Sequence, residues 1–151
     1  MITFQREYLR EVIGEVQELL VAHWHEIGEY DREKMPMNPA WDKYLKAAEL
    51  GMYIVYTARE DAELVGYITF FVAPLFHYVP HQIAENDITY IYPEHRRGLT
   101  GYRLIKFAIS DLKRYYKISA ISLRMKQKHN FGRIAERLGF KLRDLAYFME
   151  V

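Results

Sequence analysis

The sequence predicts one α/β domain in which a mixed, mostly antiparallel sheet is flanked by about four helices. Two observations favour this class. Strand-like segments and segments with helical periodicity follow one another in the order strand, two helices, several strands, helix, strand, helix, strand. The chain also has 151 residues, 50% of them hydrophobic, and it contains no repeat, low-complexity tract or linker. We therefore expect residues 1–151 to form a single domain.

The N-terminal third is predicted to hold a short strand and two helices. The strand covers Ile2–Gln5. From Tyr8 to Ile27, apolar residues recur at spacings of three and four, which is the pattern of an amphipathic helix. A loop over Asp31–Pro39 then leads to a second amphipathic helix, Trp41–Leu50, which ends at Gly51.

The middle of the chain is predicted to be mostly strand. Met52–Ala58 and Leu64–Val72 are rich in β-branched and aromatic residues, and the polar turn Arg59–Glu63 between them indicates a hairpin. After a loop over Pro74–Pro80, a third strand is expected over Asp87–Tyr92, where side-chain alternation would place Asp87, Thr89 and Ile91 on one face.

The C-terminal third alternates between the two kinds of element. We expect a helix over Leu99–Tyr116, a strand over Ile118–Met125, a short helix over Asn130–Leu138 closed by Gly139, and a last strand over Lys141–Glu150. The two strand–helix–strand passages should form parallel crossovers of right-handed connection.

The composition excludes several classes of protein. There is no cysteine, which excludes disulfides, thiolate nucleophiles and cysteine-ligated metals, and no metal is expected because His23 and His25 lack metalloprotease spacing. The formal net charge is +1, and no apolar run approaches the roughly 20 residues of a membrane span. A nucleic-acid partner is not expected, since Asp111 interrupts the basic residues Arg96, Arg97, Arg103, Lys106 and Lys113. We expect a cytoplasmic monomer or homodimer with no membrane partner.

The segment Pro93–Tyr102 is the best candidate for a ligand site. It joins the third strand to the longest C-terminal helix, and it contains Arg96, Arg97, Gly98 and Gly101. Backbone N–H groups at a helix N-terminus attract anions, and arginine donates paired hydrogen bonds to phosphate oxygens. The pattern matches neither a dinucleotide fingerprint nor a Walker loop. It predicts a phosphate or pyrophosphate site, the alternative being a basic helix start without a ligand.

This segment resembles the pyrophosphate loop of the GNAT acyltransferase superfamily, usually written Arg/Gln-x-x-Gly-x-Gly/Ala. Arg96 matches its first position and Gly101 its last, whereas Leu99 replaces the middle glycine and Gly98 comes one residue early. The order of elements and the run Glu136–Phe140, with its Leu-Gly-Phe, resemble the family too. The chain also resembles an uncharacterised subgroup from phage and bacterial genomes. The residues that carry this resemblance are His23-Trp24-His25-Glu26, Gly66-Tyr67, His77-Tyr78, Asp87-Ile88 and the loop Arg96-Arg97-Gly98.

The resemblance implies an N-acetyltransferase that moves an acetyl group from acetyl-coenzyme A to a small-molecule or protein primary amine by direct attack. The strand before the loop would align the pantetheine arm, and an asparagine often lies near the coenzyme. The implied coenzyme-binding residues are Tyr90, Ile91, Tyr92, Arg96, Arg97, Gly98, Leu99, Thr100, Gly101, Tyr102 and Asn130. For Asn130, a simple helix cap is the alternative.

The chemistry requires a base, because a free alkylamine has a pKa of about 10.4 and must lose a proton before it attacks. Asp87 is the first candidate, although an aspartate at a strand start also bonds local backbone. His77 is the second, with a plain surface histidine as the alternative reading. Glu26 is the third, because it ends the helix that shapes the acceptor site in the family.

The departing thiolate would be protonated by a tyrosine in many family members. Ala135 occupies the position of that tyrosine here, so the candidates for a proton donor are Tyr147, Tyr90 and Tyr92. The alternative is that the thiolate leaves without a dedicated acid. The missing tyrosine favours a second hypothesis, in which the chain is a catalytically weak binding module that acts on a partner protein.

Overall fold

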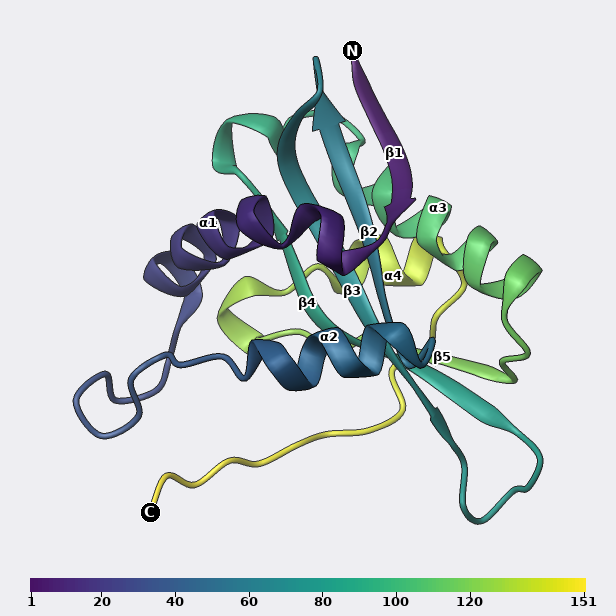
Figure 1. Ribbon diagram of the computed structural model, residues 1–151. Coiled ribbons are helices and arrows are strands. Elements are labelled where there is room, and N and C mark those ends of the chain that lie inside the picture. Colours follow the sequence, from purple (N-terminus) through teal and green to yellow (C-terminus); the bar gives the residue numbers. More distant parts are fainter.

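The computed structural model describes residues 1–151 and contains one five-stranded sheet of order β1-β2-β3-β4-β5 (Figure 1). Neighbouring strands are antiparallel except for the parallel pair β4 and β5. The strands are β1 (Ile2–Glu7), β2 (Tyr53–Glu60), β3 (Glu63–Pro74), β4 (Gln82–Ile91) and β5 (Ala120–Ser122). The helices are α1 (Leu9–Ile27), α2 (Trp41–Glu49), α3 (Thr100–Tyr115) and α4 (Gly132–Arg137), with short 3-10 helices at Pro93–His95 and Gln127–His129.

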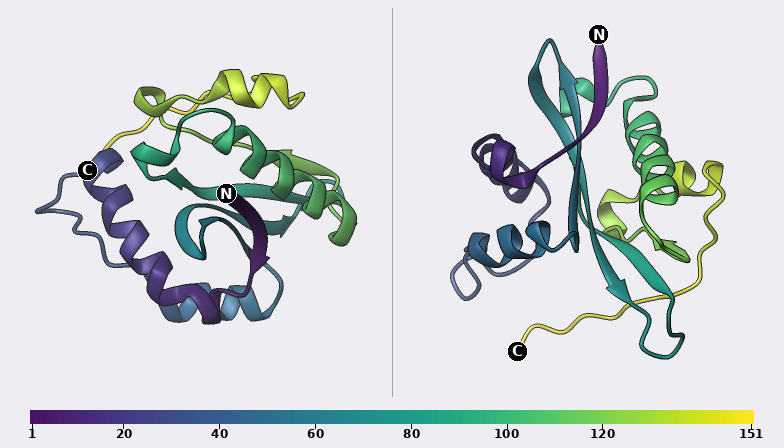
Figure 2. Two further views of the ribbon diagram at one scale, coloured as in Figure 1. Left: turned by 90° about the horizontal axis from the view of Figure 1, so that it is seen from above. Right: turned by 45° about the vertical axis from the view of Figure 1, so that its right-hand side comes forward.

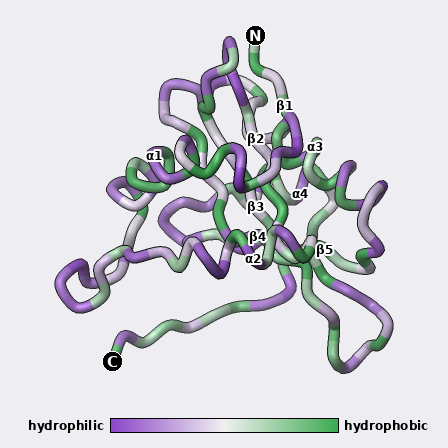
Figure 3. The backbone as a smooth tube through the Cα atoms, in the orientation of Figure 1, coloured by the Kyte–Doolittle hydropathy of each residue, from purple (hydrophilic) through white to green (hydrophobic).

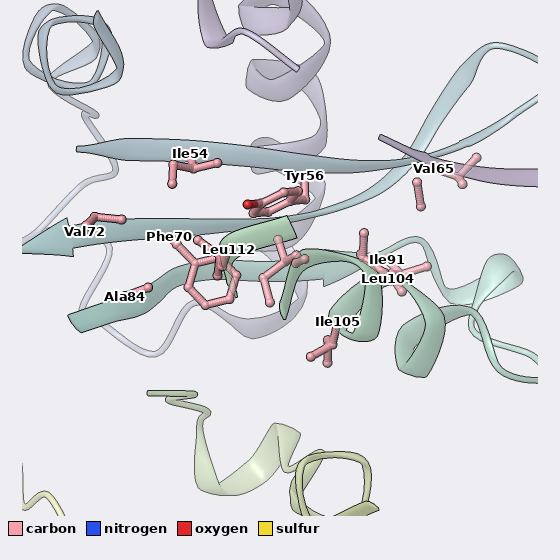
Figure 4. Packing of buried hydrophobic residues seen from close by; sticks show 13 residues of the cluster. Ile54, Tyr56, Val65, Phe70, Val72, Ala84, Ile91, Leu104, Ile105 and Leu112 are labelled. Carbon is pink, nitrogen blue, oxygen red and sulfur yellow. The ribbon is translucent and has the colours of Figure 1, made fainter. Parts of the chain in front are cut away.

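The helices cover both faces of the sheet. Figure 2 shows α1 and α2 on one face and α3 and α4 on the other. The α3 side holds a cluster of 13 buried residues that includes Phe70, Leu104 and Leu112 (Figure 4). The α1 side holds nine, including Leu9 and Tyr67. Burial of these side chains is the main stabilising contribution to the fold.

Most of the elements expected from the sequence are confirmed. Hydrophobic and hydrophilic residues alternate along α1 (Figure 3), and its apolar stripe packs on the sheet as its period predicts. The β2–β3 hairpin and the parallel β4–α3–β5 crossover are also present. Strands β3 and β4 are longer than predicted, because β3 continues to Pro74 and β4 already begins at Gln82.

The prediction of a last strand over Lys141–Glu150 is wrong. These residues form no strand, and large side chains such as Leu142 and Tyr147 are exposed. The second parallel crossover is therefore absent. The strand expected over Ile118–Met125 is reduced to Ala120–Ser122. A strand needs the backbone groups of a neighbour, and an edge of three residues offers few.

None of the helices combines the length and the apolar character that crossing a membrane would need.

Candidate active site

A β-bulge in β4 aims Asp87 at the α2 side of the sheet. Two residues, Asp87 and Ile88, lie opposite the single residue Thr69 of β3, whose hydroxyl accepts the Ile88 N–H at 3.2 Å. Asp87 thus faces α2. The Thr89 hydroxyl instead accepts a hydrogen bond from the Asn86 carboxamide at 3.1 Å, and Ile91 packs in the core on the α3 side. The predicted common face of Asp87, Thr89 and Ile91 is therefore wrong, because a bulge reverses the alternation at the extra residue.

Two tyrosines hold the carboxylate of Asp87. The hydroxyl groups of Tyr44 on α2 and Tyr53 on β2 donate to Oδ2 at 3.2 and 3.3 Å. Desolvation raises the pKa of Asp87, although these two hydrogen bonds act in the opposite direction. The carboxylate also lines a recess of about 230 Å³ with Phe71, Glu85, Asn86 and Arg124. A carboxylate of raised pKa in a recess is the usual setting of a general base.

Beside this recess, β4 and β5 separate and leave a backbone edge open. Their pairing ends at Glu85 and Ser122. The Asn86 side chain then accepts the Arg124 N–H and donates to its carbonyl oxygen at 3.0 Å. Beyond this bridge, the edge of β4 that faces β5 pairs with no strand. Unpaired N–H and C=O groups of this kind can bind an extended, amide-bearing ligand.

At the far end of this edge, the start of α3 forms a cradle of N–H groups. None of the six backbone N–H groups from Arg97 to Tyr102 has an acceptor in the chain, and no side chain caps the helix. Gly98 has a φ of 72°, which glycine adopts without strain. Arg97 is exposed and pairs with no carboxylate. The positive end of the 16-residue helix adds to this charge, so the cradle fits a phosphate group.

The two predicted loop arginines differ in their surroundings. Arg96 is engaged by the protein: it forms a two-point ion pair with Glu26 at 2.6 and 2.7 Å, and its Nε donates to the Ile91 carbonyl oxygen at 2.8 Å. Tyr90 donates to the same Glu26 carboxylate at 2.8 Å. Three of the predicted residues therefore meet at the C-terminal end of α1, in a cluster of their own that contains no contact to Asp87.

Other predicted residues are placed outside these clusters. His77 is exposed in the loop between β3 and β4, away from Asp87 and from the N–H cradle. Tyr147 lies on the C-terminal segment, where 98% of its surface is exposed. The Asn130 carboxamide accepts the Gly132 N–H at 2.7 Å, which supports its reading as a local cap.

Within the loop, Gly101 faces the protein interior. A Cβ atom there would meet the side chains of Ile134 at 3.6 Å and Ile91 at 3.7 Å. Leu99 is about half exposed, and Thr100 is buried, its hydroxyl bonded to the Arg97 carbonyl oxygen at 3.4 Å. Gly98, rather than Gly101, has the backbone conformation that requires glycine.

Sequence reasoning missed the residues that surround Asp87. Tyr44 and Tyr53 lie within a predicted amphipathic helix and a predicted strand, where a tyrosine side chain ordinarily packs. They do pack, at a ring distance of 4.9 Å, but their hydroxyl groups reach Asp87. Asn86 directly precedes Asp87, and a polar pair at a strand is the one available signal for it.

His23 is a packed histidine. Its Nδ1 lies 3.2 Å from the Tyr67 hydroxyl, and its ring stacks on Tyr90 at 4.9 Å. Burial lowers its pKa to about 4; Glu26 opposes this shift, and Lys126, His129 and Arg96 add to it.

The buried His23 should make the fold less stable in mild acid. The unfolded chain gains a proton near pH 6.5, whereas the native chain resists protonation until about pH 4. The free energy of unfolding should therefore fall as the pH drops through this window, by about 3 kcal/mol in total. Urea unfolding at several pH values would measure this. His23→Gln should flatten the dependence and His77→Gln should preserve it; equal slopes in all three proteins would contradict the assignment.

The comparisons with known proteins identify the family and the fold. A model of the acetyltransferase (GNAT) family matches residues 15–140, so the chain belongs to that family. No curated protein matches the chain.

Solved structures share the fold at low sequence identity. A GCN5-related N-acetyltransferase from Ralstonia eutropha has a TM-score of 0.76 at 15% identity, with 99% of each chain covered. A predicted acetyltransferase with acetyl-CoA from Clostridium acetobutylicum has 0.70 at 13%, covering 99% of this chain and 96% of that one. An aminoglycoside acetyltransferase from an uncultured soil sample, in complex with sisomicin, has 0.73 at 12% with the same coverage.

The family membership confirms the class of enzyme and its cosubstrate. The protein is an acyltransferase that uses acetyl-coenzyme A, as the resemblance of its loop implied.

Proposed function

We propose that the protein acetylates a primary amine by direct attack on the acetyl thioester, with Asp87 as the general base. The observation that carries this proposal is the bulge, which places a doubly hydrogen-bonded carboxylate in a recess beside the open edge of β4. Burial also raises the pKa of Asp87. A raised pKa makes a carboxylate a better proton acceptor at neutral pH.

The chain offers a continuous binding surface for acetyl-coenzyme A, which supplies the acetyl group as a thioester. The N–H cradle from Arg97 to Tyr102 would hold the pyrophosphate, with the unpaired Arg97 adding charge. The open edge of β4, which ends at Ile91 just before Tyr92, would bind the pantetheine arm through its amides. This edge runs from the cradle back to the Asp87 recess, so a ligand extended along it reaches the base.

Asp87 would take a proton from the acceptor amine, directly or through a water molecule. Tyr44 and Tyr53 fix the orientation of its carboxylate, and the remaining oxygen is free to accept. Phe71 provides an apolar wall against which a neutral amine is favoured over an ammonium ion.

The alternative is a coenzyme-binding module without efficient transfer. Ala135 is 6% exposed and carries no proton donor. The candidate Tyr147 lies on the exposed C-terminal segment, so neither position supplies the tyrosine that is missing from the family pattern. If the thiolate has to leave without a dedicated acid, acetyl transfer is slow but coenzyme binding stays intact. Slow transfer with intact binding is the behaviour that the binding-module hypothesis predicts.

Calorimetry and a thiol-release assay would test the function. We expect micromolar affinity for coenzyme A, and free thiol that appears only when an acceptor is present. The acceptor panel should contain polyamines, amino acids, aminoglycosides and peptide N-termini. Tight coenzyme binding with no thiol release from any acceptor would favour the binding module instead, and absent coenzyme binding would contradict both.

A further inference from the structure

We propose that Glu26 is a positioning residue for the coenzyme loop. Arg96 is then a structural residue that ties this loop to α1, here called the strut, and is not a phosphate ligand. Glu26 lies in the last turn of α1, whereas Arg96 lies in the turn between β4 and α3. Their ion pair connects the helix on one face of the sheet to the turn that presents the N–H cradle. The inference rests on the proposed placement of the pyrophosphate at this cradle.

The contacts of Arg96 use the part of the guanidinium that a phosphate would need. Nη1 and Nη2 donate to the two carboxylate oxygens of Glu26 at 2.6 and 2.7 Å, and Nε donates to the Ile91 carbonyl oxygen at 2.8 Å. The guanidinium also lies 5.2 Å from the centre of the Tyr90 ring, and the Tyr90 hydroxyl completes the bonding of Glu26. Such a two-point pair fixes an arginine in orientation as well as in position.

The same contacts make Glu26 a poor candidate for the general base of the reaction. The hydrogen bond from Arg96 is the main reason that the pKa of Glu26 is lowered, and a lowered pKa weakens a base. With 29% of the Glu26 side chain and 42% of the Arg96 side chain exposed, the pair is only partly screened by solvent.

The strut acts where the backbone must change direction. Ile91 is the last residue of β4, and only Tyr92 and the short 3-10 helix Pro93–His95 separate it from Arg96. By bonding the Ile91 carbonyl oxygen and Glu26 together, Arg96 ties both ends of this turn to α1. Gly98 then adopts its left-handed φ, and the six N–H groups follow. The direction of the cradle therefore depends on Glu26, although Glu26 touches no part of it.

The variant Glu26→Gln distinguishes the two roles of Arg96, because the strut and a phosphate ligand predict opposite changes in the Kd for coenzyme A. If Arg96 bound the pyrophosphate, removing the competing negative charge of Glu26 would tighten coenzyme A binding. If Glu26 holds the strut, the same change should loosen the turn and raise the Kd for coenzyme A about tenfold, as expected for the loss of a charged hydrogen bond. Glu29→Gln is the matched control, because Glu29 lies three residues further on and pairs with Lys126 at 3.3 Å. It should leave the Kd unchanged.

Arg96→Gln and the double variant Glu26→Gln/Arg96→Gln complete the calorimetric series. Each single change should weaken binding by a similar factor, and the double variant should be no weaker than either, because both changes remove one strut. Independent, multiplying effects of the two changes would overturn the proposal.

Limited proteolysis gives a second readout that needs no ligand. Trypsin cleaves after Arg97, within the turn that the strut holds. In the free protein, Glu26→Gln should be cleaved there several times faster than the wild type or Glu29→Gln, at an unchanged melting temperature. Tighter coenzyme binding in Glu26→Gln, or cleavage at the wild-type rate, would overturn the strut. A normal Kd in Arg97→Ala would instead refute the placement of the pyrophosphate, while the cleavage rates would still decide whether the strut exists.

Discussion

Replacing Asp87 with asparagine should lower turnover by about 10²–10⁴-fold and leave the affinity for coenzyme A unchanged. Asparagine keeps the shape of the side chain, and its carbonyl oxygen can still accept hydrogen bonds from Tyr44 and Tyr53. It cannot take up the amine proton. Steady-state kinetics with an acceptor from the panel, together with calorimetry, would separate the loss of turnover from a loss of binding.

The pH dependence provides the control for a structural role of Asp87. In the wild type, activity should fall as the pH drops through the raised pKa of Asp87, and this acidic limb should disappear in Asp87→Asn. Because that pKa is raised in the folded state, ionised Asp87 destabilises the fold above it, so the variant should melt no lower than the wild type. Glu85→Gln, in the same recess, should keep the limb. Normal turnover of Asp87→Asn at every pH would exclude Asp87 as the base.

The helices and most strands were predictable because each is specified by its own residues. The apolar stripe of α1 repeats with a helical period over 19 residues, and no other element is needed to define it. The strand expected over Lys141–Glu150 shows the limit of the method. Its apolar residues match a strand, but a strand also needs a partner, and no local pattern reveals that β5 has only three residues.

The sequence predicts the candidate site as a set of residues and not as a geometry. Asp87 is a candidate base from the sequence alone, but its orientation depends on a bulge that arises from the register of β3 against β4. Arg96 was assigned to phosphate because arginine next to a glycine turn usually serves anions. Its actual partner, Glu26, lies 70 residues away in the sequence, and only the packing of α1 on the sheet brings the two charges together.

Arg97→Ala should weaken coenzyme A binding about 10- to 150-fold, the second largest effect that we expect. Arg97 begins the N–H cradle, is exposed and has no carboxylate partner, so its charge is available to a pyrophosphate. Losing a charged hydrogen bond of this kind costs about 1.5–3 kcal/mol, which corresponds to this range of Kd. Since Arg97 stabilises no other part of the protein, its removal should leave the melting temperature unchanged.

Lys113→Ala distinguishes a local effect of Arg97 from the loss of one positive charge. Lys113 is exposed in the last turn of the same helix, at the end opposite the cradle. Removing it changes the net charge equally, but its distance from the cradle exceeds the screening length of about 8 Å at physiological salt. Calorimetry should therefore give a wild-type Kd for Lys113→Ala, and a smaller salt dependence of the Kd for Arg97→Ala. Equal weakening in both variants would mean that only the overall charge matters, and the pyrophosphate would have to bind elsewhere on the chain.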